Sequence, residues 1–134
     1  MRMNGWVVFS GIMLFMAGVF GAIDGLVAII VEEVWLVSDD QAILLDIQAW
    51  GWVHLIVGSI AVVTGIAVLS GQLWAIILGI LLAMISAFSH LMFITVFPWW
   101  SLAIIAIDIL VIYGLVVHGG EAAEAAEAAE NRVA

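Results

Sequence analysis

Each long apolar segment of the chain contains one ionisable side chain, and these four side chains are the candidates for binding a proton, a metal or a ligand. They are Asp24, His54, His90 and Asp108. An acidic side chain at the centre of a membrane-spanning helix costs roughly 2.5 to 3.5 kcal/mol, so such a residue marks either a function or a specific partner. Two carboxylates and two imidazoles admit three chemistries: hydrogen-bonded pairs that fix helix register, a proton relay or quinone-head site, and a metal or haem site.

A metal site would draw on the same four side chains, because the chain contains no cysteine. The candidate ligands are therefore Asp24, His54, His90 and Asp108. Two imidazoles with two carboxylates suit Zn²⁺ or a first-row metal, and two imidazoles on neighbouring helices could serve as axial haem ligands. No His-x-x-x-His spacing occurs, and no internal Arg or Lys is present to pair with haem propionates. The sequence leaves the three chemistries open and identifies no cofactor.

The elements that must position these side chains are membrane-spanning helices. Of the 134 residues, 67% are hydrophobic and only 10% are charged, which is too little polar surface for a water-soluble domain. Crossing a hydrocarbon core takes about 20 apolar residues. Spans are predicted at about 5–31, 49–69, 73–97 and 99–117. The predicted fold is all-α: an integral membrane four-helix bundle, antiparallel and up-down, with a short acidic outer loop between helices 1 and 2.

Small residues share a helix face with three of the ionisable side chains. The stripes are Ala17, Gly21, Asp24 and Ala28; His54, Gly58, Ala61 and Gly65; and Gly79, Ala83, Ala87 and His90. Small faces let membrane helices approach closely, so these side chains are predicted to point into the bundle, and the cost of exposing Asp108 predicts the same for it. At about 1.5 Å of rise per residue, all four lie about 8 to 13 Å below the outer boundary. They are therefore predicted to share one polar layer.

Charges and tryptophans predict the orientation of the spans. Arg2 precedes the first span and Arg132 follows the last, so the positive-inside rule places both termini in the cytoplasm of a multi-pass cell-membrane protein. Trp50, Trp52, Trp99 and Trp100 are expected at the outer interface, and Trp6 and Trp74 at the inner one. The formal net charge of −9 excludes nucleic acid as a partner.

The segment after the last span has a different composition. Gly119 and Gly120 are read as the stop of the fourth helix, with His118 as a favourable charge near its end. Residues 121–134 repeat Glu-Ala-Ala and are predicted to form a solvated, acidic cytoplasmic tail. The chain is thus divided into a transmembrane domain, residues 1–120, and this tail.

Several short motifs resemble those of an uncharacterised family of small four-span membrane proteins common in actinobacteria. The motifs are Gly5-Trp6-Val-Val-Phe9 with Gly11 and Ala17-Gly18, Ile23-Asp24-Gly25-Leu26, Ala49-Trp50-Gly51-Trp52 with His54-Leu55 and Gly58, and Trp100-Ser101-Leu102 with Ile107-Asp108. The resemblance covers nearly the whole span region and implies a four-helix fold without an activity. In size and span number the chain is also similar, by analogy alone, to DoxX-type quinone-associated membrane proteins.

These observations predict a structural or accessory subunit of a membrane assembly without its own enzymatic activity, because the spans leave no room for a soluble catalytic domain. Expected partners are the lipid bilayer and either further copies of the chain or a larger membrane complex. The alternative is a membrane-embedded binding protein or proton relay, in which the four ionisable side chains hold a metal, haem or quinone head.

Overall fold

The computed structural model describes residues 4–30, 47–92, 94–95 and 97–133. In this part of the chain it contains four α-helices: α1 (Gly5–Ile30), α2 (Ile47–Leu69), α3 (Leu73–Met92) and α4 (Pro98–Val133). Each is long and apolar enough to cross a membrane. The predicted all-α membrane fold with four spans is confirmed. The predicted acidic outer loop lies almost entirely outside the described residues.

Local sequence explains where the helices begin and end. The side-chain oxygen of Asn4 accepts a hydrogen bond from Trp6 N at 2.9 Å and caps α1. After α2, Gly71 adopts a φ of 75°, its N–H bonds to Val68 O, and Gln72 N bonds to Ala67 O. This is a Schellman motif, in which a glycine accepts the left-handed conformation that other residues avoid. Pro98 occupies the first turn of α4, where its missing N–H leaves no intrahelical bond unmade.

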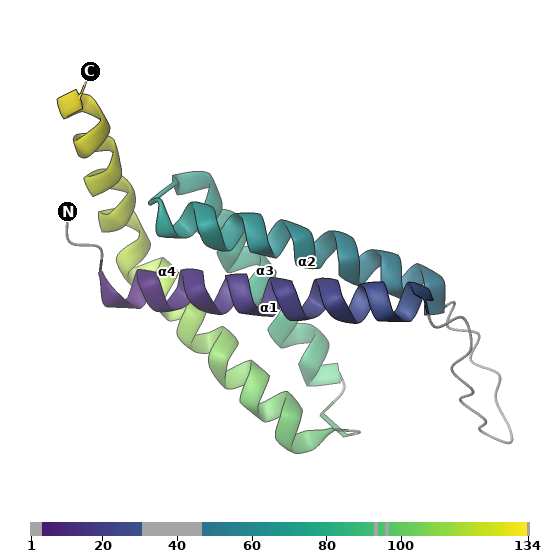
Figure 1. Ribbon diagram of the computed structural model, residues 1–134. Helices are drawn as coiled ribbons and strands as arrows, with labels where there is room; N and C mark the ends of the chain where they lie inside the picture. The colour runs from purple at the N-terminus through teal and green to yellow at the C-terminus, as the bar shows by residue number, and fades with distance from the viewer. Residues whose placement is uncertain (1–3, 31–46, 93, 96, 134) are drawn as a thin grey trace, which may run out of the picture.

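The helices form two hairpins that cross each other (Figure 1). Within the first, Gly11, Gly18 and Gly25 of α1 meet successively earlier residues of α2, so these two helices run in opposite directions. In the second, Gly79 of α3 contacts Leu115 and Gly119 of α4 contacts Ile76, again in opposite directions. The end of α1 and the start of α2 diverge from the end of α3 and the start of α4 (Figure 1). The arrangement differs from a bundle with four nearly parallel axes.

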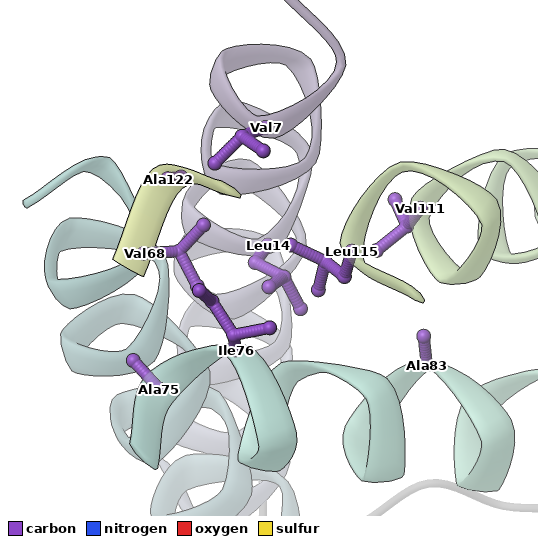
Figure 2. Close-up of a cluster of buried hydrophobic side chains, with 9 residues drawn as sticks. All are labelled: Val7, Leu14, Val68, Ala75, Ile76, Ala83, Val111, Leu115 and Ala122. Atoms are coloured by element: carbon purple, nitrogen blue, oxygen red, sulfur yellow. The ribbon is translucent and has the colours of Figure 1, made fainter. Parts of the chain in front are cut away.

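The core lies where the hairpins cross. Its buried side chains come from all four helices (Figure 2) and are Val7, Leu14, Val68, Ala75, Ile76, Ala83, Val111, Leu115 and Ala122. Leu14 and Leu115 meet near its centre (Figure 2), and both would contact a methyl group placed on Gly79. Next to it, the Ser10 hydroxyl on α1 donates to Trp6 O at 2.8 Å and to Val111 O of α4 at 3.3 Å. The hairpins are therefore joined near the start of α1.

The predicted end of the fourth helix at Gly119-Gly120 is wrong, because α4 continues to Val133. A methyl group on Gly119 would lie 2.6 Å from Ile76 Cγ2, so this glycine permits close packing with α3 instead of ending the helix. Ala and Glu favour helix strongly enough to continue it. Ala122 is only 6% exposed, and the α2–α3 turn at Gly71 packs on it. The first turn of the predicted tail thus belongs to the core.

Candidate functional site

Two spaced sets of glycines form the seam between α1 and α2. They are Gly11, Gly18 and Gly25 on α1, and Gly51, Gly58 and Gly65 on α2, each set spaced by seven residues. A methyl group on Gly18 would lie 2.5 Å from Val62 N, and one on Gly58 would lie 2.5 Å from Ala22 N. Backbone atoms cannot move aside as a side-chain tip can. The seam therefore requires glycine, and it fixes which face of α1 is turned toward α2.

Asp24 lies outside this seam. Gly25 packs against the backbone of His54 and Leu55, and Asp24, one residue or about 100° earlier on the helix, is exposed. Among the described residues no hydrogen-bond or ion-pair partner of Asp24 is found. The prediction that Asp24 points into the bundle is wrong for the single chain. The reason is that the period-seven glycines, and not the stripe of Ala17, Gly21 and Ala28, form the centre of the α1–α2 contact.

His54 is half-buried on α2 and has a defined hydrogen bond. Its Nδ1 lies 3.1 Å from Trp50 O, one turn earlier, and the indole ring of Trp50 lies beside the imidazole with a centroid separation of 4.2 Å. A carbonyl oxygen can only accept, so Nδ1 carries the hydrogen. Nε2 is then the atom with which His54 can bind a second partner. Asp24 and His54 are the single titratable side chains of α1 and α2, respectively.

The second hairpin brings His90 and Asp108 together beside Ser86. His90 Nδ1 donates to Ser86 O at 2.8 Å, and the Ser86 side chain and the His90 ring both lie near the Asp108 carboxyl. Asp108 Oδ2 is buried and has no hydrogen-bond partner among the described residues. Ser101, two turns earlier on α4, is fully buried, and its Oγ likewise has no partner in the part of the chain that the structure describes. The Asp108 carboxyl can therefore hold a proton or accept a hydrogen bond from a ligand.

The four ionisable side chains are divided between the two hairpins. His90 and Asp108 lie near each other on the α3–α4 hairpin, whereas Asp24 and His54 belong to the α1–α2 hairpin, and the two hairpins diverge at this end (Figure 1). Within the described ranges, no group of three or more His, Asp or Glu side chains is arranged to hold a metal ion. The two imidazoles proposed as axial haem ligands lie on different hairpins, His54 on α2 and His90 on α3.

A polar and aromatic cluster at the opposite end was not predicted. Asn4 Nδ2 lies 2.9 Å from His118 Nδ1, and the Trp6 ring stacks on the His118 ring with Tyr113 edge-on to both. Asn4 Oδ1 is already bound to Trp6 N, so the amide group donates and His118 Nδ1 accepts. Because α4 continues past it, His118 does not act as a charge at a helix end. The feature of the sequence that could have indicated this cluster is Asn4, because asparagine directly before a helix commonly caps it.

A protein-family model described as a domain of unknown function (DUF7144) matches residues 6–120. The match covers all four predicted spans and ends where the repeated Glu-Ala-Ala segment begins. No curated protein and no solved structure matches the chain.

Proposed function

Since the chain belongs to the DUF7144 family, whose function is unknown, we propose from the geometry that it is a non-enzymatic structural or accessory subunit of a membrane assembly. The observation that carries this proposal is the exposed carboxyl of Asp24 on an otherwise apolar helix. A lone chain leaves that carboxyl against lipid, at a cost of roughly 2.5 to 3.5 kcal/mol on insertion scales. A neighbouring membrane helix that offers a hydrogen-bonding group removes much of this cost.

The surface around Asp24 fits contact with other helices. Phe20, Ile23 and Val27 on α1 and Val53 on α2 are large apolar side chains, each more than half exposed. The tryptophans near the helix ends, such as Trp52 and Trp99, are also exposed, as expected for anchors at the membrane interface. Asp24 is therefore a single polar group on a broad apolar face. In membranes such a group contributes specificity to helix association, while packing supplies much of the remaining free energy.

The experiment that tests this proposal is chemical crosslinking in native membranes, followed by native mass spectrometry from nanodiscs. We expect a complex larger than the 14.4 kDa chain, containing more than one polypeptide. Recovery of the chain as a monomer in both measurements would contradict the assembly role. Turnover of a substrate by the purified chain alone would contradict the non-enzymatic part of the proposal.

The proposed orientation places both ends of the span region in the cytoplasm. The contact between Asn4 and His118 supports a common side for both ends, and Arg2 and Arg132 favour the cytoplasmic one. The cysteine-free sequence makes the test direct. A Gly120→Cys chain in right-side-out vesicles should resist a membrane-impermeant maleimide until the vesicles are opened, whereas labelling of intact vesicles would reverse the orientation.

The second candidate function is a proton-binding or quinone-head site at Ser86, His90 and Asp108. It is favoured by one specific observation: Asp108 Oδ2 is buried near His90 and has no hydrogen-bond partner among the described residues. A buried carboxyl of this kind needs either a proton or a ligand donor. NMR titration of His90 should change in an Asp108→Asn chain. An identical titration curve would remove the reason for this candidate.

A further inference from the structure

We propose that Asp24 of one chain binds His54 of a second copy, and that the reciprocal pair forms across a two-fold axis. This inference rests on the proposed function and names the partner: another copy of the same chain. It starts from two polar side chains that have unused hydrogen-bonding capacity in the single chain. Asp24 is exposed with no partner among the described residues, and His54 has bound only its Nδ1, to Trp50 O.

The two groups lie at the same level of the α1–α2 hairpin. Gly25, next to Asp24, packs against the backbone of His54 and Leu55, and Gly21 lies 3.9 Å from His54 O, measured from its ideal Cβ position. A two-fold axis along the membrane normal keeps every residue at its own depth. An acid on one copy therefore meets an imidazole of the other copy at matching depth, and the same contact repeats on the far side of the axis, as an isologous interface requires.

Charge complementarity within the chain selects His54 as the partner. His90 already lies near an acid of its own hairpin, Asp108, and His118 accepts a hydrogen bond from Asn4. No other charged or titratable side chain occurs on α1 or α2. Among the described histidines, His54 is thus the one with no acidic or amide side chain beside it, and Asp24 is the acid at the same level of the same hairpin.

The hydrogen bond to Trp50 O determines the protonation of the proposed contact. Because Nδ1 of His54 already donates its hydrogen, a neutral ring presents a lone pair at Nε2, which would repel a carboxylate. The contact therefore holds one further proton between Nε2 and the Asp24 carboxyl. No other side chain of α1 or α2 is titratable, so this proton is shared between Asp24 and His54.

Space around Asp24 allows another helix to approach. Ala17 is exposed, and Gly21 and Ala28, one turn to either side of Asp24, are half-buried. These side chains are short, so they do not hold a neighbouring helix away from the carboxyl. They permit the contact, and the unpaired acid and imidazole specify it.

The test is complementation between two variants that fail alone. An Asp24→His chain pairs imidazole with imidazole, and a His54→Asp chain pairs carboxyl with carboxyl. Mixed together, the two variants restore one acid–imidazole contact on each side of the axis. An intrachain contact cannot be restored in this way, because each chain keeps its own mismatched pair.

Association is measured by energy transfer in proteoliposomes between copies labelled at Gly120→Cys, a position where an added side chain meets nothing within 4 Å. Losing two polar contacts should weaken association of each single variant by about 10- to 100-fold, and mixing should restore most of the transfer. A matched pair for comparison is Asp108→His mixed with His90→Asp, because these two residues lie near each other within one chain. Mixing these two should change nothing.

Three outcomes would overturn the proposal: single variants that associate as tightly as the natural chain, mixtures that fail to restore association, and a natural chain that stays monomeric in liposomes. Circular dichroism of each variant checks that helix content is retained. A monomeric natural chain that is nevertheless crosslinked to other polypeptides in native membranes overturns only this inference. In that case the proposed function stands and the partner is a different protein.

Discussion

The two hairpins are held together by different chemistry. The α1–α2 hairpin is joined by six glycines that bring backbone against backbone, whereas the α3–α4 hairpin relies on side chains, with Ser86, His90 and Asp108 between its helices. A glycine seam leaves no room for a polar side chain between the helices. Asp24 is consequently displaced to the outside of the first hairpin, while Asp108 is retained inside the second. Seam chemistry therefore determines which acid is available to a partner.

The largest expected effect comes from adding a methyl group to the glycine seam. In a Gly18→Ala chain the new Cβ would lie 2.5 Å from Val62 N and 2.6 Å from Gly58 O. Because both are backbone atoms, α1 and α2 must separate, and we expect a loss of about 3 kcal/mol in the free energy of unfolding. SDS titration in bicelles, followed by circular dichroism, measures it.

Gly21→Ala on the same helix is the matched comparison. Its nearest atoms are at 3.7 and 3.9 Å, which is ordinary contact, and alanine favours helix over glycine by about 1 kcal/mol. This chain should be as stable as the natural one or more so. Equal losses in the two variants would contradict the seam as the basis of the first hairpin.

The next effect concerns the end of α4. Ala122→Glu places a carboxylate at a site that is 6% exposed against the α2–α3 turn, so we expect the segment after Gly120 to detach, with a loss of about 1 to 3 kcal/mol. Amide hydrogen exchange over residues 121–133 should become faster. Ala125→Glu makes the same change at an exposed site of the same helix and should leave exchange unaltered. Fast exchange in the natural chain would show that the segment is undocked.

A smaller effect is expected where α1 and α4 meet. Asn4→Ala removes both the cap on Trp6 N and the donor to His118 Nδ1, two contributions of about 1 kcal/mol each. Asn4→Asp keeps an oxygen for the cap and loses only the donor, so it should cost roughly half as much near neutral pH. Thermal unfolding monitored by tryptophan fluorescence compares the two. If both variants lost the same stability, the hydrogen bond to His118 would contribute nothing.

The smallest expected difference separates two fully buried serines. Ser10→Ala removes the hydroxyl that donates to Trp6 O and Val111 O, for an expected loss of about 1 kcal/mol. Ser101→Ala removes a hydroxyl whose oxygen has no partner among the described residues, so stability should change by less than about 0.5 kcal/mol or rise slightly. Unfolding in SDS measures both. A larger loss at Ser101 would mean that its hydroxyl binds something other than the described residues.

The sequence predicted which segments are helical better than it predicted how they face one another. Long apolar runs separated by Ser70-Gly71-Gln72 and by Pro98 locate all four helices, with the predicted span from 73 to 97 ending earlier, at Met92. Asp24 was misplaced for a physical reason. In a membrane protein both the buried and the lipid-facing sides of a helix are apolar, so periodicity does not distinguish them. The structure places His90 near Asp108, and the presence of Ser86 beside them was not foreseen.

The sequence by itself determined the environment of the protein and its four spans, because apolar length and turn residues act locally along the chain. Tertiary structure decided three further matters: that Gly119 lies inside a continuous helix, that period-seven glycines form a seam, and that the hairpins cross. Each depends on which surfaces of separate helices meet. The two hairpins divide four ionisable side chains of similar predicted depth: His90 and Asp108 lie near each other on one, and Asp24 and His54 lie on the other, where the described residues provide neither with an oppositely charged partner.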